Sequence, residues 1–449
     1  MKSENHLSRT YLERYSQVML GIGVVVHLIF LLSLSFGFLN SSFDDSTHRI
    51  GQGADFYAVY QAGQNVVDGV SVYLREPKTV VVPYFFLYRY LPFSAYTFGQ
   101  FFRAFSPPIA YSVWILLLEA LLFFNLGLTR KIFSNTEKGQ VAMSLWLLFS
   151  PYYLELYMGQ FSFFMATLYL WMIYHWMKKK DVRGDALWTL SLLVKTNSAL
   201  FAPVLLKMGK WKSVLVAAVI VVAVSVPYFL FMPGSFNSFA WNFTDGLSVE
   251  TIAGNQGFAS LLAVGVLRLS NQWAPNIDLF FQNIDTTNAV IRTPLILWTA
   301  LIFGISLLVT IRTSVVYSSE LFLLWILSYF LTYKHVWEHH YVMMLPVFIL
   351  LYWKIAERQT PIIISSKLFW IAFIAIALPT PFIFIDKVRV WVDPEFYWST
   401  AESIAFHIAK PVAVFALYSA LCILLWKHGK NIPVAKSPEH SHTMGIESV

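Results

Sequence analysis

The chain has 449 residues, of which 57% are hydrophobic and only 13% are charged, against about 25% charged residues in an ordinary soluble protein. This composition excludes a soluble globular protein and indicates a polytopic membrane protein, and the single cysteine excludes a disulfide, zinc or iron–sulfur framework within one chain. The net charge of +7 does not indicate nucleic-acid binding, because the cations fall in short loops between apolar segments, as positive-inside sorting requires.

About ten segments are candidate membrane spans, since a helix needs about 20 apolar residues to cross the hydrocarbon. They run over about residues 17–38, 108–128, 140–157, 161–177, 211–232, 290–310, 320–333, 341–353, 367–385 and 404–426. The first has no cleavage motif and is interpreted as a retained span rather than a signal peptide. Residues 184–206, with Lys195 at the centre, predict a re-entrant hairpin or two crossings, and residues 257–269 predict a half-embedded helix.

The positions of the cations predict the orientation. Lys2, Arg9 and Arg14 precede the first span, and Lys427, Lys430 and Lys436 follow the last. The positive-inside rule therefore places both termini in the cytoplasm. The long loops, about residues 39–83, 233–256, 270–289 and 386–403, are then external. We expect an all-α polytopic protein with about 10–13 transmembrane helices, together with re-entrant and juxtamembrane helices.

The first external loop contains a predicted amphipathic helix. Apolar residues recur from Phe56 to Val67 at helical steps, Asp55 stands at the N-cap position, and Gly69 follows the end. Such a helix is expected to lie on the membrane surface with its aromatic side down. Asp55 is then either a simple N-cap or a general base that takes the proton from a sugar hydroxyl. Its rivals as the base are Asp44, Asp45 and Asp68.

Two further groups of cations and histidines could bind phosphate. Arg89 lies between tyrosines in the run 84–93, where it either holds a lipid phosphate or snorkels to the interface. The external turn 333–341 carries Lys334, His335, Glu338, His339 and His340. On a helix His335 and His339 would share a face that suits a metal, but the order is not H-E-x-x-H and no third ligand is evident. A donor-phosphate or leaving-group site is favoured over a metal site, with an ordinary interfacial cluster as the alternative.

Polar residues inside or beside the spans are the remaining candidates. A lysine at mid-bilayer costs about 2.5–3.5 kcal/mol on insertion scales, so Lys195 should contact a phosphate or pair with an inward carboxylate such as Glu155. Gln160, Asn255 and Gln256 lie at outer span edges, where amides can bind sugar hydroxyls or cap helices. We find no Gly-rich phosphate loop, so nucleotide chemistry is not expected. We also do not find the internal repeat of many secondary transporters.

Taken in order, these motifs resemble a known family. D-F-x-x-x-Y-x-A-G begins at Asp55, D-G-x-x-x-Y begins at Asp68, and Pro92 follows. This order resembles the polyprenol-phosphate-mannose-dependent mannosyltransferases, integral-membrane enzymes of the GT-C class. Further matching pieces are Gly159-Gln160, Lys195, Asn255-Gln256 and the histidine turn, so the resemblance covers about residues 50–350. Family members often read Y-P-P after the first loop, whereas residues 88–92 here are Tyr-Arg-Tyr-Leu-Pro.

The resemblance implies a GT-C-like helical bundle with an external cavity and an inverting, nucleotide-independent reaction. A hexose, expected to be mannose, would pass from a polyprenyl-phosphate donor to a lipid- or glycan-linked acceptor on the extracytoplasmic side of the cell membrane. Asp55 matches the family's base, and His339 or a neighbouring histidine falls where the family has a functional histidine. Fixed cations such as Arg89 and Lys334 can neutralise the departing phosphate, so no metal or other cofactor is expected.

The expected organisation is a cytoplasmic N-terminus (1–16), a glycosyltransferase domain (17–426) with a catalytic external loop (39–83), and a cytoplasmic tail (427–449). The expected partners are the donor, the acceptor and membrane lipids, with no nucleic acid. The alternative function is a transporter or flippase of lipid-linked sugars.

Overall fold

The computed structural model describes residues 2–39, 51–77, 79–244, 255–258, 260–262, 265, 277–357, 364–380 and 399–429. Across these ranges the regular secondary structure is helical, and an isolated bridge pairs Asn255 with Trp337. Seven helices in the described part are long and apolar enough to cross a membrane: Glu13–Phe36, Pro107–Ile132, Trp211–Phe231, Arg292–Arg312, Val315–Thr332, Glu338–Glu357 and Ile404–His428. The prediction of an all-α polytopic membrane protein is confirmed. The number of crossings stays a prediction.

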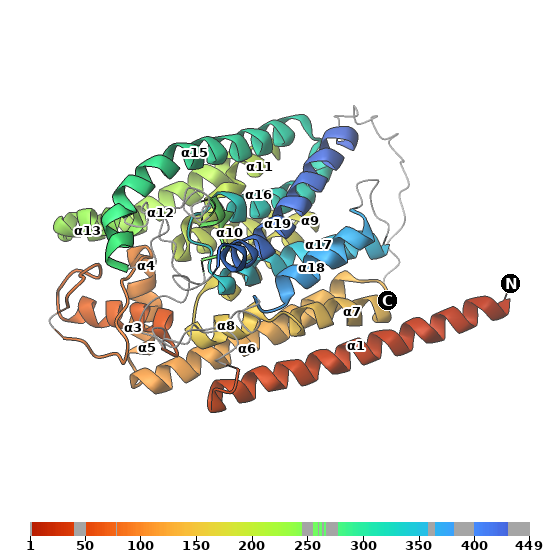
Figure 1. Ribbon diagram of the computed structural model, residues 1–449, viewed down its shortest axis with the longest axis horizontal. Coiled ribbons are helices and arrows are strands. Elements are labelled where there is room, and N and C mark those ends of the chain that lie inside the picture. Colours follow the sequence, from red (N-terminus) through yellow and green to blue (C-terminus); the bar gives the residue numbers. More distant parts are fainter. Residues whose placement is uncertain are drawn as a thin grey trace, which may run out of the picture.

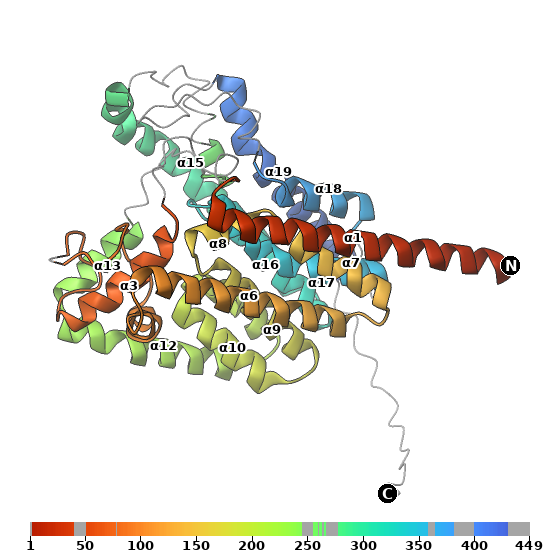
Figure 2. The same ribbon diagram turned by 90° about the horizontal axis from the view of Figure 1, so that it is seen from below.

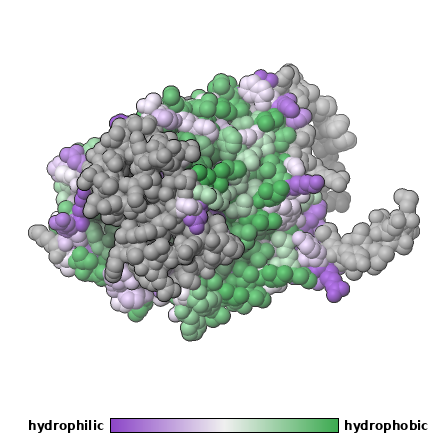
Figure 3. Space-filling view, in the orientation of Figure 1, coloured by the Kyte–Doolittle hydropathy of each residue, from purple (hydrophilic) through white to green (hydrophobic). Residues whose placement is uncertain are grey.

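Long helices form the outer part of the bundle, and shorter ones form its centre (Figure 1). The long ones are α1 (Lys2–Phe36), α6 (Pro107–Ile132), α12 (Trp211–Phe231), α15 (Ile277–Arg312) and α19 (Thr400–His428). In the apolar window of α12 only 17% of the residues are buried, against 72% in the window that includes α16 (Ser318–Thr332). The apolar side chains that α12 leaves exposed therefore face lipid. The face of the molecule shown in Figure 3 also carries much apolar surface.

The predicted span 140–157 is divided into two helices, which corrects that prediction. Helix α7 (Thr136–Leu147) ends before Pro151, and α8 (Pro151–Met158) starts there. Proline has no amide hydrogen and clashes with the preceding turn, so a helix cannot continue through it without breaking or kinking. The break gives α8 a separate direction, and α9 (Ser162–Met177) follows it after a sharp turn at Gly159.

Residues 181–207 form a re-entrant hairpin with Lys195 at its tip. Helix α10 (Asp181–Val194) rises to Lys195, and η2 (Thr196–Phe201) with α11 (Ala202–Lys207) returns. The Nζ of Lys210 lies 2.9 Å from Asp181 and 3.2 Å from Asp185, so both ends of the segment are on the same side. Since α10 has 14 residues, it extends about 21 Å, less than the about 30 Å of hydrocarbon. A re-entrant hairpin therefore fits better than two full crossings.

Short helices gather at the end of the molecule opposite the N-terminus of α1 (Figures 1 and 2). They are α3 (Ala54–Val67), α4 (Pro92–Ser94), η1 (Ala95–Gly99), α5 (Gln100–Phe102) and α13 (Gly234–Thr244). The predicted helix in the first loop is thus present as α3. It does not lie on the membrane surface, because most of its residues, including Phe56 and Val59, are buried within the protein.

The N-terminal end of α3 differs from the prediction, and its C-terminal end agrees with it. The N-cap is Gly53, with a φ of 79°, and Asp55 lies in the first helical turn, so the N-cap role for Asp55 is wrong. Gly53 adopts a left-handed conformation that a glycine allows. At the other end Gly69, with a φ of 65°, follows the helix as predicted. Asp55 is therefore not needed to cap α3.

The remaining helices complete the centre. They are η4 (Val315–Tyr317), η5 (Glu338–Met344), α17 (Leu345–Glu357) and α18 (Ser366–Ala377). Helices α17, α18 and α19 lie side by side (Figures 1 and 2). They support the turn that carries the histidines.

Candidate active site

Asp55 is held by the turn that follows α8. This turn depends on Gly159, whose φ of 65° ends α8 in a left-handed conformation. A Cβ on Gly159 would lie 2.7 Å from the Cβ of Phe56, so only a glycine lets the turn approach α3 this closely. The next residue, Gln160, forms a side-chain hydrogen bond to the carboxylate of partly buried Asp55. The structure thus brings Asp55 and Gln160, two of the predicted site residues, into contact.

Tyr90 fixes the orientation of the Gln160 amide. The Gln160 Oε1 accepts the Tyr90 hydroxyl at 2.9 Å and the backbone amide of Phe161 at 3.0 Å. With its oxygen occupied in this way, the amide presents its NH₂ group to Asp55. Tyr90, Gln160 and Asp55 thus form a chain in which each group orients the next.

The environment of Asp55 changes its acidity. Burial raises the pKa of Asp55 to about 6, while the Gln160 hydrogen bond and the charges of Lys195 and Arg89 lower it. The carboxylate remains mostly deprotonated at neutral pH, yet it is a stronger base than an ordinary aspartate. Such a pKa suits a general base that works near neutral pH.

Cations from two distant segments act on Asp55. Arg89 is exposed in the loop before α4, and Lys195 comes from the hairpin tip. The Nζ of Lys195 donates to the Ser162 hydroxyl at 3.3 Å, and the charges of both Asp55 and Glu155 act on it. Lys195 is therefore placed between two carboxylates and can also meet an anion. Both roles considered for it from the sequence are compatible with this position.

Glu155 is a second carboxylate beside Lys195. It is fully buried, and its Oε1 accepts the amide of Phe163 at 2.6 Å. Among the described residues its Oε2 has no hydrogen-bond partner. Glu155 therefore supplies negative charge that stabilises the protonated form of Lys195.

The histidine turn also lies near Lys195. His339 and His340 lie in the first turn of the helix η5, and both are within electrostatic reach of Lys195. Within the part of the chain that the structure covers, the Nε2 of His339 has no hydrogen-bond partner, whereas His340 accepts the Trp337 amide through Nδ1 at 3.0 Å. His335 precedes η5, so it does not share a helical face with His339 as a metal pair would.

Tyr333 extends the same region toward Arg89. The side chain of Tyr333 is 37% exposed, and the charge of Arg89 acts on it. Lys334, the next residue, is partly buried at the start of the turn. Asp55, Arg89, Lys195 and the turn are thus linked through successive electrostatic contacts.

Three predicted ligands make their hydrogen bonds inside the protein. Asn255 donates to the Lys334 carbonyl at 3.0 Å and accepts the Gly257 amide at 3.1 Å. Gln256 donates its backbone amide to the Val336 carbonyl at 2.6 Å. Glu338 pairs with Lys410 at 3.1 Å. These residues brace the histidine turn, and their predicted role in binding substrate stays a prediction.

The rival carboxylates of the first loop are differently placed. Asp44 and Asp45 lie outside the described residues. Asp68 ends α3, where its Oδ1 accepts the Gln64 amide at 2.8 Å in an exposed position. Asp68 is therefore a solvated helix end rather than part of the site.

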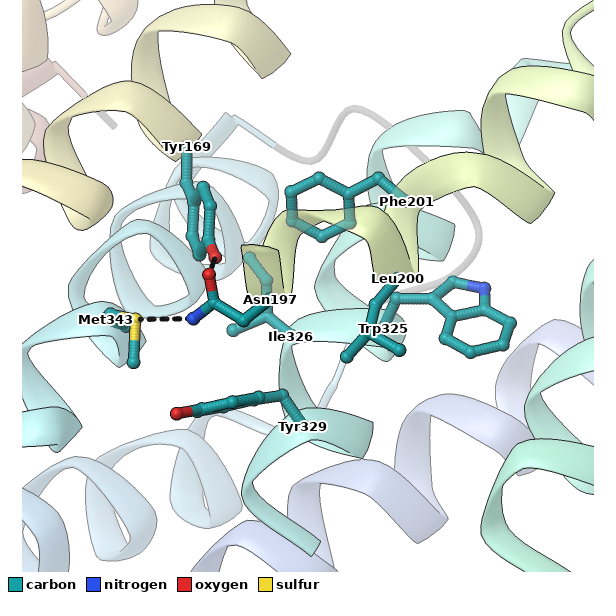
Figure 4. A pocket seen from close by; sticks show the side chains of 8 residues that line it. All are labelled: Tyr169, Asn197, Leu200, Phe201, Trp325, Ile326, Tyr329 and Met343. Carbon is teal, nitrogen blue, oxygen red and sulfur yellow. Dashed lines mark hydrogen bonds between the residues drawn. The ribbon is translucent and has the colours of Figure 1, made fainter. Parts of the chain in front are cut away.

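A small cavity of about 10 Å³ adjoins the hairpin tip (Figure 4). Its lining comprises Tyr169, Asn197, Leu200, Phe201, Trp325, Ile326, Tyr329 and Met343. Asn197 accepts the Tyr169 hydroxyl at 3.0 Å and donates to the Met343 sulfur at 3.5 Å. A space of this size holds about one water molecule, so it does not accommodate a sugar.

Sequence reasoning missed Tyr90, Thr380 and Lys410, which orient the predicted residues. Tyr90 stood next to Arg89 in a run of aromatic residues and had no distinguishing signal. Lys410 had one, because an ionisable residue inside an apolar span indicates a functional or paired group. Its importance is visible only after the fold brings it to Glu338.

A comparison with protein families gives one match. The model of glycosyltransferase family 87 (GT87) matches residues 86–332, more than half of the chain. No curated protein matches the chain. The matched segment includes Arg89, Gln160, Lys195, Asn255 and Gln256, while Asp55 and the histidine turn lie outside it.

Proposed function

This chain belongs to glycosyltransferase family 87, and on that premise we propose that it transfers a hexose from a polyprenyl-phosphate donor. Family membership and the membrane helices are consistent with a GT-C-type membrane glycosyltransferase. We take mannose as the sugar and a lipid- or glycan-linked hydroxyl as the acceptor. The reaction is assigned to the extracytoplasmic side of the cell membrane, because the cation-rich loops lie at the other ends of the spans.

The observation that carries this proposal is the position of Asp55. Its carboxylate is fixed by Gln160 and lies within reach of Lys195 and Arg89, which come from separate parts of the chain. A base oriented by one hydrogen bond and surrounded by cations suits the deprotonation of an alcohol beside an anionic leaving group.

In the proposed step Asp55 takes the proton of the acceptor hydroxyl. The acceptor oxygen forms a bond to the anomeric carbon of the sugar while the bond from that carbon to the phosphate oxygen breaks. The electron pair leaves with the polyprenyl phosphate, and attack from the opposite face inverts the anomeric centre. The proton on Asp55 is later released to water.

The departing phosphate gains negative charge and needs fixed positive partners. Arg89 can bind two phosphate oxygens with its planar guanidinium group. Lys195 and Lys334 add single positive charges, and His339 can donate a hydrogen bond from an imidazole nitrogen that is otherwise unused among the described residues. Preorganised donors of this kind stabilise charge that develops in the transition state.

The test is sugar transfer by the Asp55→Asn variant in the purified, full-length protein. The donor is a synthetic polyprenyl-phosphate mannose, and donor binding is measured separately. We expect transfer to fall by about 10²–10⁴-fold while the donor still binds. A variant with normal transfer would exclude Asp55 as the base. Movement of intact donor across vesicles without any transfer would instead support a flippase.

A further inference from the structure

Buried polar contacts join the histidine turn to the helices α18 and α19. Glu338, which directly precedes His339, accepts the Nζ of Lys410 at 3.1 Å through Oε1. The amide of Thr380 donates to the same oxygen at 2.9 Å, and the Thr380 hydroxyl donates to Oε2 at 2.8 Å. The Glu338 and Lys410 side chains are only 5% and 1% exposed. Both carboxylate oxygens are therefore occupied, so Glu338 is poorly suited to bind a substrate.

Lys410 uses all of its donors within this network. Besides Glu338, its Nζ donates to the carbonyls of Ile376 and Leu378 at 2.6 and 2.7 Å. These carbonyls belong to the C-terminal end of α18, where helix carbonyls have no partner in their own helix. An ammonium group has three donors, and here all three are satisfied. Lys410 thus connects α19, the end of α18 and Glu338.

The other side of the turn is fixed by Gln256. Its side-chain amide donates to the Thr380 hydroxyl, and its backbone carbonyl accepts the Tyr341 hydroxyl at 2.9 Å. Its backbone amide donates to the Val336 carbonyl at 2.6 Å. The turn is therefore attached on both sides of His339 and His340.

We propose that Glu338 and Lys410 form a positioning pair that holds His339 and His340 within reach of Lys195. This inference rests on the proposed function, because it assumes that the histidine turn acts on the donor phosphate. Burial of an ion pair is weak evidence for a stabilising role, since desolvation offsets much of the attraction. Ionisable residues inside a membrane segment mark functional positions. Neither residue lies in the segment matched by the family model.

The chain contains a matched control for this pair. Lys354 and Glu320 form a second buried ion pair, 2.7 Å long, with side-chain exposures of 5% and 1%. They join the start of α16 to the end of α17, outside the turn. Loss of either lysine leaves a buried carboxylate without its cation, so the two variants share the general penalty. Only loss of Lys410 should loosen the histidine turn.

The first measurement is hydrogen–deuterium exchange of peptides covering residues 333–344 in the full-length protein. We expect faster exchange there in Lys410→Met and unchanged exchange in Lys354→Met. Thr380→Val, which removes one hydroxyl and nearly preserves volume, serves if Lys410→Met does not fold, and it should show a smaller increase. Exchange equal to that of the wild type in the folded variants of Lys410 and Thr380 would overturn the positioning role.

The second measurement is a double-mutant cycle in which kcat is the readout. It separates an effect through the histidines from a general loss of structure. We expect Lys410→Met to lower kcat by about 10²-fold in the wild-type background and to have no effect in a His339→Ala/His340→Ala background. Equal losses in both backgrounds would refute the pair's action through the histidines. Asp55→Asn is measured in parallel: normal transfer in that variant contradicts the proposed base, whereas the exchange experiment reports on the turn alone.

Discussion

Two carboxylates, Asp55 and Glu338, differ in how their oxygens are bonded. Asp55 is partly buried and accepts one hydrogen bond from an amide, and the charges of Lys195 and Arg89 act on it electrostatically. Glu338 is buried and has both oxygens occupied by Lys410 and Thr380. A carboxylate with most of its acceptor sites unused can take a proton, whereas one whose two oxygens both hold partners is better suited to positioning them. The region around Asp55 therefore suits chemistry, and the region around Glu338 suits support.

The same contrast separates the elements that carry these residues. Asp55 lies on α3, which packs tightly against η1 through Gly63 and Gly99, and Lys195 lies at the tip of a hairpin. Glu338 lies at the junction of η5, α18 and α19, which a buried ion pair with Lys410 connects. One region obtains its rigidity from small residues and the other from polar links.

The largest effects are expected for the variants of the two carboxylates, Asp55→Asn and Glu338→Gln, which should lose different properties. Asp55→Asn should reduce transfer by about 10²–10⁴-fold with little change in stability, because the amide still accepts from Gln160. Glu338→Gln should lower the free energy of unfolding by about 3–5 kcal/mol, since it leaves a buried cation unpaired. Activity assays and thermal unfolding in detergent measure both quantities. Equal stability losses in the two variants would remove the distinction drawn between these acids.

A smaller effect on stability is expected at Gly63. A Cβ at this position would lie 2.4 Å from the carbonyl oxygen of Gly99, and overpacking of this kind costs about 1–3 kcal/mol. Gly63→Ala should therefore lower the melting temperature and also transfer, because α3 carries Asp55. Gly127→Ala is the control, since a Cβ there meets nothing within 4 Å. A Gly63→Ala protein as stable and active as Gly127→Ala would argue against the close packing of α3 on η1.

The pH profile tests the electrostatic part of the comparison. The wild-type kcat/KM should rise with pH around the Asp55 pKa of about 6, because the base must be deprotonated. Lys195 lowers this pKa, so Lys195→Met should move the acid limb to higher pH. The Lys354→Met profile should keep its midpoint, since Lys354 pairs with Glu320 instead. A Lys195→Met limb at the wild-type position or lower would contradict the assignment of the limb to Asp55.

Much of the fold followed from hydropathy, because long apolar segments have few alternatives in a membrane. The charge pattern around residues 184–206 left a re-entrant hairpin and two crossings as alternatives, and the structure favours the hairpin. The single span 140–157 was wrong because Pro151 interrupts the helix within a continuous apolar run. The N-cap role of Asp55 was wrong because Gly53, with its positive φ, starts the helix two residues earlier. Local patterns predicted the elements but not their exact ends.

The candidate site was only partly predictable for a different reason. Residues such as Asp55 and Lys195 were conspicuous because a charge in or beside an apolar segment requires a partner or a function. The partners themselves come from distant segments, and their pairing is a property of packing. Lys410 and Glu338 are separated by 72 residues in the chain, yet their charged atoms lie 3.1 Å apart. Nothing in either local sequence indicates the other.

The smallest effect is expected for Tyr90, which acts on Asp55 only through Gln160. Tyr90→Phe removes the hydroxyl that donates to Gln160 at 2.9 Å, a loss of about 1 kcal/mol. Among the described residues the Gln160 oxygen then keeps only the Phe161 amide as a donor, so its side chain is oriented less firmly and kcat should fall about 5-fold. Tyr88→Phe is the matched control, because its buried hydroxyl donates to the Leu91 carbonyl and not to Gln160. If both variants lose the same activity, the effect comes from the aromatic loop as a whole. If only Tyr90→Phe loses activity, the hydrogen bonds from Tyr90 through Gln160 orient the carboxylate of Asp55. Glu338 differs, because its orientation depends on an ion pair.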